Sequence, residues 1–186
     1  MDVGQEGSDE WLMAHVAQGH AGQIEPLVRR YGTPLLTFIR HMVGDHHRSE
    51  ELFQEVFLAV WTRRRLYRYP LPFKPWLYQI ALNRCRQWFR TRRPEAIQSL
   101  DDDSPRQFAM AGPSPPESAI AVETASIVGR VVALLPPRQH SVVVMRLWGG
   151  LSYAEIAAAM EVSEGTVRSN MHDALAFLHR HLEARV

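Results

Sequence analysis

The sequence contains a single cysteine, Cys85, among its 186 residues. One cysteine forms no internal disulfide and has no thiolate partner for a metal site, which fits a reducing cytosol. No apolar run is long enough to span a membrane, and the acidic, polar residues 1–10 give no secretory signal. We find no phosphate-cradling glycine loop, nucleophile elbow or carboxylate pair in a plausible cleft. We therefore expect a cytoplasmic protein with no membrane insertion, no catalytic residues and no enzymatic activity.

Nine histidines raise the possibility of a metal site. His41, His46 and His47 cluster near one expected helix end, but no histidine has a ligand spacing supported by cysteine or carboxylate. We interpret them as solvated or capping side chains and predict no metal and no cofactor. Neighbouring arginines can lower the pKa of a thiol such as Cys85, but a packed, unreactive thiol is the stronger expectation.

Acidic residues are absent from residues 63–93, which contain ten Lys/Arg. The other residues contain eleven basic and twenty acidic side chains, so the net charge of +1 conceals one concentrated positive segment. Such a segment is typical of a protein that binds a polyanion. A hydrophobic content of 46% with 22% charged residues is globular and excludes disorder over the whole length.

Helical periodicity dominates, and no sustained alternation demands a sheet, so we predict an all-α protein with two small helical domains. The first domain covers residues 8–93, with Ser8 as a helix N-cap and later helices at about 22–43, 47–64 and 73–92. The Gly32-Thr33-Pro34 segment is expected to kink or interrupt the helix over 22–43.

Residues 94–117 differ in composition, because five prolines and an Asp101-Asp102-Asp103 run leave little apolar material to bury. We interpret them as a flexible, acidic, Pro-rich linker. The second domain covers residues 118–184, with helices expected at about 117–135, 137–148, 153–160 and 163–182.

Residues 152–180 have the spacing of a helix-turn-helix. Ser152-Tyr153-Ala154-Glu155 has the S-x-x-E form of a capping box. Alanines 157–159 are small enough for close helix crossing, and Val162 and Val167 are expected to fill the core under the turn. The second helix presents polar residues at the end that enters a major groove. The alternative is a helical hairpin whose polar residues are only a solvated face.

Aromatic side chains are interleaved with the positive charges of the first domain. Unpaired bases stack on such rings, at about 1–3 kcal/mol each. Tyr67 and Tyr69 lie in a Pro-bounded loop and are expected to contact solvent or ligand, whereas Trp76, Tyr78 and Trp88 have helical spacing and are expected in the core. The loop over residues 65–72 is short and stiff enough to receive an extruded base.

These segments resemble the sigma factors of the extracytoplasmic-function (ECF) group, within the sigma-70 family. Residues 50–57 (EELFQEVF) resemble that group's polymerase-clamp-binding helix, and residues 76–83 (WLYQIALN) resemble its WLxxIAxN segment. Residues 151–157 (LSYAEIA) and 165–169 (GTVRS) match in the second half. The similarity covers residues 10–93 and 118–182 in the expected order, which is more specific than a helix-turn-helix alone.

The resemblance implies a promoter-specificity and DNA-melting subunit of bacterial core RNA polymerase that serves a stress- or signal-responsive regulon, with promoter DNA as ligand and an anti-sigma factor as partner. The expected clamp-binding residues are Glu51, Leu52, Gln54, Glu55 and Phe57. The residues expected to capture the non-template strand of the minus-10 element are Arg63, Arg64, Arg65, Tyr67, Tyr69, Asn83, Arg84, Arg86, Gln87 and Arg90. Those expected to read the minus-35 duplex are Ser163, Glu164, Thr166, Arg168, Ser169, Asn170 and His172.

The second domain departs from the family pattern, which continues past GTVxS with further basic residues. Here the stretch is Asn170-Met171-His172-Asp173, and Asp173 repels phosphate. Fewer phosphate contacts imply weaker binding with a shallower salt dependence.

Two other functions remain as alternatives. The first is a stand-alone helix-turn-helix regulator with a sensing or dimerising first half, although a sensor has no need of a basic, aromatic segment. The second is an RNA-binding or polymerase-tethered adaptor that does not melt promoters.

Overall fold

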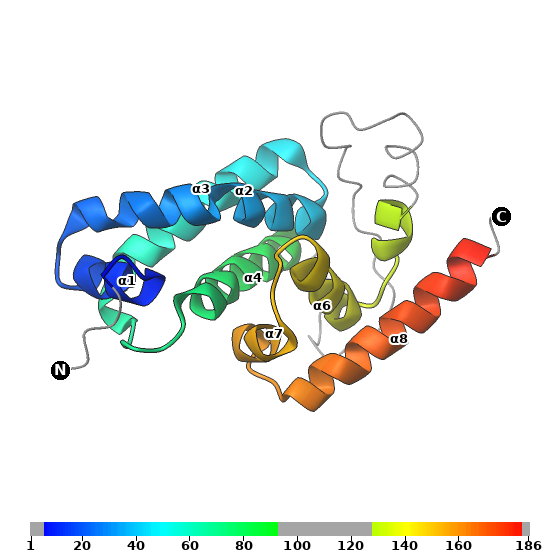
Figure 1. Ribbon diagram of the computed structural model, residues 1–186. Coiled ribbons are helices and arrows are strands. Elements are labelled where there is room, and N and C mark those ends of the chain that lie inside the picture. The colour runs from blue at the N-terminus through cyan, green and yellow to red at the C-terminus, as the bar shows by residue number, and fades with distance from the viewer. Residues whose placement is uncertain (1–5, 93–127, 184–186) are drawn as a thin grey trace, which may run out of the picture.

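The computed structural model describes residues 6–92 and 128–183, which form two groups of helices without strands (Figure 1). The first group contains α1 (Asp9–Ala17), α2 (Ile24–Val43), α3 (His46–Thr62) and α4 (Phe73–Arg92), with short 3₁₀ turns at Ala21–Gln23 and Arg64–Leu66. The second contains α6 (Pro137–Leu147), α7 (Tyr153–Met160) and α8 (Glu164–Glu183), preceded by helical residues 128–132. The predicted all-α class is confirmed, whereas the predicted linker over 94–117 lies outside the described residues.

Side-chain caps begin two helices of the first group, and the one at Ser8 is the cap that the sequence predicts. The Ser8 hydroxyl accepts a hydrogen bond from the Trp11 amide, 3.1 Å away, so Ser8 is the N-cap of α1. The Asp45 carboxylate accepts one from the Arg48 amide at 2.9 Å and caps α3. Each cap satisfies an amide that the helix itself leaves unpaired.

Helix α2 runs unbroken through Pro34, so of the predicted kink or interruption at Gly32-Thr33-Pro34 the interruption is wrong. Pro34 removes one backbone hydrogen bond, at a cost of about 3 kcal/mol in a helix interior. Leu27 and Leu35, on either side of the proline, are both fully buried. Burying each such side chain contributes about 1.5–3 kcal/mol, which offsets the local cost.

Helix α4 is 20 residues long, and a side chain of α1 binds its first amide. The Glu10 carboxylate of α1 accepts a hydrogen bond from the Phe73 amide at 3.1 Å. Phe73, Leu77 and Tyr78 are fully buried, and the ring of Tyr78 meets Phe38 of α2 edge to face at 5.1 Å. This packing fixes one side of α4 in the core and leaves the other side exposed.

The second group has the geometry of a helix-turn-helix. The predicted capping box is confirmed, because the Ser152 hydroxyl accepts from the Glu155 amide and the Glu155 carboxylate accepts from the Ser152 amide. Glu161 then adopts a left-handed conformation (φ 56°) that turns the chain toward α8.

Val167 is buried in the turn of this motif as predicted, but Val162 is 37% exposed, which corrects its predicted place in the core. The left-handed backbone at Glu161 turns the next residue outward before α8 begins.

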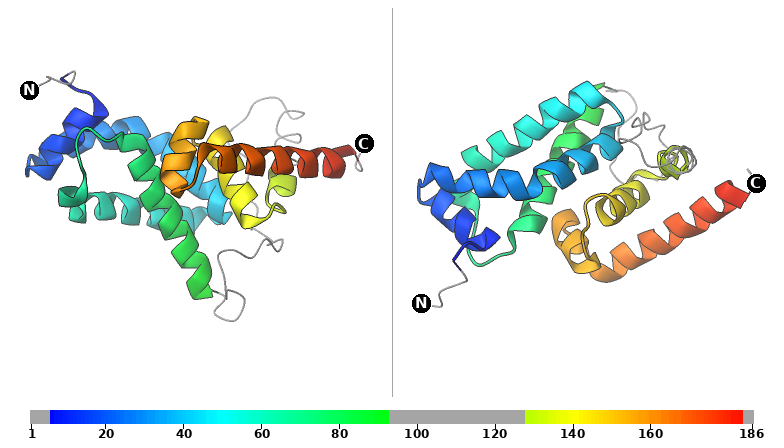
Figure 2. Two further views of the ribbon diagram at one scale, coloured as in Figure 1. Left: turned by 90° about the horizontal axis from the view of Figure 1, so that it is seen from below. Right: turned by 45° about the horizontal axis from the view of Figure 1, so that its top comes forward.

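The two groups pack directly on each other. Helix α7 lies along α4, and α6 lies against α2, as the views in Figures 1 and 2 agree. We call this the packed arrangement. None of the helices in the described ranges is long and apolar enough to cross a membrane.

Candidate nucleic-acid interface

The exposed side of α4 carries the polar residues predicted to contact DNA. Asn83, Gln87 and Arg90 are exposed and share one helix face, since they are four and three residues apart. Arg84 is partly exposed and its guanidinium lies 3.5 Å from the Gln87 side-chain oxygen. The helix contains no acidic residue, so nothing on it competes with phosphate for these cations.

The three arginines of the loop that precedes α4 differ in their exposure to solvent. Arg63 and Arg65 are exposed, whereas Arg64 is partly buried. The Arg64 guanidinium donates to the Trp61 carbonyl at 2.8 Å and lies 4.1 Å from the centre of the Trp61 ring. Arg63 and Arg65 are therefore available to a phosphate backbone, and Arg64 is committed to the end of α3.

The two loop tyrosines have separate environments. Tyr69 is 46% exposed, as expected for a ring that receives a base, and Leu66 and Leu71 beside it are also exposed. Tyr67 is only 8% exposed and meets Trp76 edge to face at 5.3 Å. Its hydroxyl donates to the Leu71 carbonyl, and burial raises its pKa, so it stays protonated.

The expected exposure of Tyr67 is therefore wrong: it is a core residue that shapes the loop. Tyr78, as predicted, is fully buried, and Trp76 and Trp88 are partly buried against the same core.

A stripe on α3 matches most of the predicted clamp-binding set. Glu51 and Gln54 are exposed, Glu55 and Phe57 are partly exposed, but Leu52 is 1% exposed. Leu52 packs inward because it shares the apolar face of α3 with Val56, and its predicted role at the surface is wrong.

Arg48 organises the acidic residues of this stripe. Its guanidinium pairs with Glu51 at 2.7 Å and with Glu55 at 3.0 Å. Arg48 thus fixes the two carboxylates on one side of the helix.

Sequence reasoning missed Leu58, which is 62% exposed on the same stripe. It follows Gln54 by four residues and Glu51 by seven, so all three lie on one side of α3. A large apolar side chain at a polar helical position was the signal available in the sequence. We define the α3 stripe as Glu51, Gln54, Glu55, Phe57 and Leu58.

The residues predicted to read duplex DNA lie at the start of α8. The Ser163 hydroxyl accepts from the Thr166 amide at 3.1 Å and so caps the helix. Asn170 donates its side-chain amide to the Thr166 carbonyl at 2.9 Å. Ser169 and His172 are exposed, as is Asp173 beside them.

Arg168 is held in place on the surface of the second group. It pairs with Glu164 at 2.5 Å, and its guanidinium lies 4.9 Å from the centre of the Tyr153 ring. A preorganised arginine loses less side-chain entropy when it binds a base edge or a phosphate. Among the residues of α8 that were predicted to read duplex DNA, three are exposed and can donate a hydrogen bond: Arg168, Ser169 and His172.

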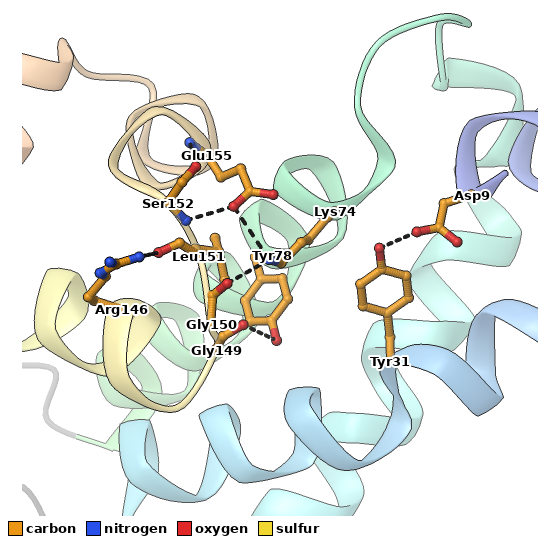
Figure 3. A network of polar contacts seen from close by, with 10 residues as sticks. All are labelled: Asp9, Tyr31, Lys74, Tyr78, Arg146, Gly149, Gly150, Leu151, Ser152 and Glu155. Atoms are coloured by element: carbon orange, nitrogen blue, oxygen red, sulfur yellow. Dashed lines mark hydrogen bonds and ion pairs between the residues drawn. The ribbon is translucent and has the colours of Figure 1, made fainter. Parts of the chain in front are cut away.

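Polar contacts join the two groups at one place (Figure 3). The Lys74 ammonium of α4 donates to the Gly150 carbonyl at 2.7 Å and pairs with Glu155 at 3.4 Å. The Tyr78 hydroxyl lies 3.3 Å from the Gly149 carbonyl oxygen, to which it donates. The pKa of Glu155 is lowered by hydrogen bonds from Ser152 and by the charge of Lys74, although burial acts in the opposite direction.

A cavity of about 140 Å³ lies where α4 meets the helix-turn-helix. Arg86 of α4 lines it together with Thr166 and Asn170 of α8. The pKa of Arg86 is lowered, first by burial and then by the neighbouring charge of Arg138. The packed arrangement therefore brings a residue predicted for the minus-10 element next to two predicted for the minus-35 element.

Burial shifts the pKa of two histidines and of the cysteine. Burial lowers the pKa of His41 to about 4 and of His140 to about 3, so both imidazoles are neutral near pH 7. Burial raises the pKa of Cys85 to about 12 and outweighs the charges of Arg48 and Arg86, so its thiol is packed and protonated.

Family models match both halves of the chain. The model for sigma-70 region 2 covers residues 27–95, and that for sigma-70 region 4 covers residues 126–178. The RNA polymerase sigma-E factor of Streptomyces avermitilis is 30% identical over an alignment of 176 positions that covers 91% of this chain and 90% of that protein. The chain belongs to the ECF group of the sigma-70 family. As a sigma factor of this group, it directs RNA polymerase to initiate transcription at specific promoters.

Other relatives agree with this sigma factor in sequence and fold. The ECF RNA polymerase sigma-E factor of Escherichia coli K12 is 28% identical and covers 91% of both chains. The structure of CnrH in complex with the cytosolic domain of CnrY is 23% identical, with a TM-score of 0.73 over 96% of this chain and 99% of that one. RpoE of Bartonella quintana, crystallised with the anti-sigma factor NepR, has a TM-score of 0.68, is 19% identical, and covers 86% of this chain and 96% of its own.

Proposed function

We propose that the two helical groups of this sigma factor divide promoter recognition between single-stranded and duplex DNA. The first group captures the non-template strand of the minus-10 element, the helix-turn-helix reads the minus-35 duplex, and the α3 stripe binds the polymerase clamp. The protein acts in the bacterial cytoplasm as a regulatory subunit and performs no catalysis of its own.

The observation that carries this proposal is the exposed, acid-free face of α4 beside the Tyr69 loop. Asn83, Gln87 and Arg90 point away from the core, and Tyr69 offers an exposed ring nearby in the chain. Cations attract the phosphate backbone, while an aromatic ring stacks an unpaired base. This combination suits a melted strand better than an intact duplex, whose bases are already stacked on each other.

The helix-turn-helix suits the complementary task. Helix α8 begins at a capped N-terminus, and Arg168 and Ser169 follow in its first two turns. An arginine at this position of a recognition helix contacts guanine edges or phosphates in a major groove. Exposed Asp173 opposes phosphate, so we expect this group to depend on polymerase for much of its affinity.

We also propose that an anti-sigma factor regulates the protein. The supporting observation is that the similar structures of CnrH and RpoE were each solved with a bound partner, in the second case a named anti-sigma factor. To inhibit, such a partner has to cover the α3 stripe or the DNA-contacting faces.

Transcription with purified core polymerase tests the main proposal. We expect promoter-specific run-off transcripts from a genomic fragment library with core polymerase and this protein alone. Replacing Asn83 and Gln87 by Ala is expected to abolish those transcripts while leaving core binding unchanged, because both side chains are exposed. Transcripts that appear only when another sigma factor is added contradict the proposal and indicate an adaptor, and no core binding at all indicates a stand-alone regulator.

A further inference from the structure

The first turn of α1 lies against the loop that is proposed to capture a base. The Glu10 carboxylate accepts a hydrogen bond at 3.1 Å from the amide of Phe73, which is 63 residues further along the chain. Helix α1 also packs against the Arg64–Leu66 turn, so it contacts the chain on both sides of residues 67–72. We call residues 67–72 the capture loop, and it carries the exposed ring of Tyr69.

The capture loop does not itself supply an acceptor for the start of α4. Leu71 and Pro72 directly precede Phe73, and neither side chain accepts a hydrogen bond. The first amides of a helix have no partner within it, and the usual partner is a Ser, Thr, Asp or Asn side chain immediately before the helix. Glu10 provides this acceptor from another helix, and its negative charge also suits the positive end of the α4 dipole. The start of α4 is therefore tied to α1.

Aromatic rings hold the same point from the other side. Tyr67, the first residue of the capture loop, is buried, and its hydroxyl donates to the Leu71 carbonyl near the end of the loop. The centre of the Tyr67 ring lies 6.2 Å from that of the Phe73 ring. Tyr31 of α2 meets the Phe73 ring edge to face at 5.5 Å, and its hydroxyl donates to Asp9 of α1 (Figure 3). Both ends of the capture loop are thus fixed, while residues 68–71 between them are exposed.

The charge of Glu10 does not favour DNA binding. A carboxylate near a loop that meets phosphates repels them, so on electrostatic grounds alone its removal strengthens DNA binding. A loop that is already ordered loses less conformational entropy when a base docks on it, so freeing the loop weakens binding. The two effects have opposite signs, and the sign of the change in affinity therefore reports the role of Glu10.

We propose that Glu10 is a positioning residue for base capture: by binding the Phe73 amide it holds the capture loop so that Tyr69 is ready to receive an unpaired base. This inference rests on the proposed function, because it concerns the placement of a ring that strand capture uses. In this role Glu10 contacts no DNA and acts only through the backbone at the start of α4. Its effect on promoter binding therefore depends on the presence of the Tyr69 ring.

Binding of fork-junction DNA tests the proposal. Such DNA, made from a promoter recovered by run-off transcription, is duplex upstream and presents the non-template minus-10 strand unpaired. We expect holoenzyme with Glu10→Ala to bind it at least fivefold more weakly than wild type, at a temperature at which thermal melting shows both proteins folded. Glu10→Gln keeps an oxygen that accepts from the Phe73 amide and is expected to restore wild-type affinity.

The matched control is Glu25→Ala, which removes an exposed first-turn carboxylate from α2. It is expected to leave fork-junction binding unchanged. The affinity for core polymerase is expected to be the same in all of these variants, because the α3 stripe lies on another helix.

A double-mutant cycle separates positioning from a general loss of structure. In protein that already carries Tyr69→Ala, the ring that Glu10 positions is gone, so adding Glu10→Ala is expected to weaken fork-junction binding less than twofold further. A general destabilisation weakens binding by the same factor in both backgrounds. Equal factors in the two backgrounds, or binding by Glu10→Ala alone that is as tight as wild type or tighter, overturn the proposal.

Hydrogen exchange of the Phe73 amide reports the anchor in the free protein, without DNA. We expect this exchange to be at least fivefold faster in Glu10→Ala than in wild type and unchanged in Glu10→Gln. Equal rates in Glu10→Ala and wild type overturn the role of Glu10. A wild-type holoenzyme that binds fork-junction DNA no better than fully paired DNA of the same sequence contradicts the proposed function instead, and the exchange rates then still decide whether Glu10 anchors the loop.

Discussion

The imidazole of His41 stacks face to face on the indole of Trp148, so a titratable ring from the first helical group lies against an aromatic ring from the second. Both His41 and its buried neighbour His140 have lowered pKa values. A histidine whose pKa is lower in the folded protein than its usual value of about 6.5 binds fewer protons when folded. Its protonation therefore favours separation or unfolding.

Acid is accordingly expected to destabilise the protein through these histidines. The free energy of unfolding is expected to fall as pH drops below about 6.5, and the loss is complete for His41 near pH 4. Urea unfolding from pH 7.5 to 5.5 measures this decline above the range in which most carboxylates titrate. His41→Phe keeps a ring for Trp148 and is expected to flatten the decline, whereas His172→Gln on the exposed face of α8 is not. An unchanged decline in His41→Phe contradicts this account.

The two loop tyrosines are expected to give opposite phenotypes. Tyr69→Ala removes an exposed ring and is expected to reduce promoter opening by about 5- to 150-fold, at about 1–3 kcal/mol for a lost base stack. Tyr67→Ala empties a buried site and is expected to cost about 3–5 kcal/mol of stability. Permanganate reactivity of unpaired thymines reports opening, and thermal melting reports stability. Normal opening by a stable Tyr69→Ala protein argues against base capture at this ring.

Leu58 is expected to contribute to polymerase binding. Leu58→Asp replaces a 62% exposed apolar side chain on the α3 stripe, so the fold is expected to be unaffected. Loss of one buried leucine from an interface, at about 1.5–3 kcal/mol, corresponds to roughly a 10- to 100-fold weaker affinity for core polymerase. Fluorescence anisotropy with labelled sigma factor measures this. Leu175→Asp, 57% exposed on α8, is the matched control.

The salt dependence of duplex binding is expected to change at Asp173. Asp173→Arg adds a cation to the exposed face of α8, and one extra phosphate contact steepens the plot of log K against log salt by about 0.9. Titration of non-specific duplex DNA between 50 and 200 mM salt is a suitable measurement. Asp173→Asn removes repulsion without adding a contact, so it is expected to raise affinity with little change of slope. If the Arg and Asn variants have the same slope, the exposed face of α8 at Asp173 does not contact the phosphate backbone of DNA.

The capping box of α7 is expected to contribute measurably to stability. Ser152→Ala removes the acceptor for the Glu155 amide, 3.2 Å away, and is expected to cost about 1 kcal/mol in the free energy of unfolding. The midpoint of urea unfolding measures the loss. Ser169→Ala, exposed within α8, is expected to have no such effect because its hydroxyl caps no helix. Equal midpoints for the two variants contradict a capping contribution.

Local sequence patterns predicted the features that depend on neighbouring residues, which are the helix caps and most helix positions. The caps at Ser8 and Ser152 and the positions of most helices depend on neighbouring residues, and all are found where the pattern places them. Pro34 was misjudged because its cost is local, whereas the burial of Leu27 and Leu35 that outweighs it depends on the whole domain.

Burial of individual side chains was also mispredicted where it depends on tertiary contacts. Tyr67 lies in a Pro-bounded loop, yet α4 returns Trp76 to cover it. The Tyr67–Trp76 contact crosses a loop, where no helical period applies, and Tyr78 and Gly149 are 71 residues apart along the chain, so no sequence pattern predicts either contact. The contact between the helical groups was for that reason absent from the sequence-based expectations.

The arginines of α4 have a consequence for the helix itself. Arg84, Arg86 and Arg90 lie in its C-terminal half, and Arg90 stands in the last turn, where the aligned peptide dipoles accumulate negative charge. A bare helix end of this kind repels phosphate, and the guanidinium groups reverse that field. The same charges stabilise the helix terminus before any nucleic acid arrives, so the DNA-binding face is already folded when it meets a promoter. Neutralising these arginines one by one is thus expected to fray the end of α4 as well as to weaken its hold on DNA.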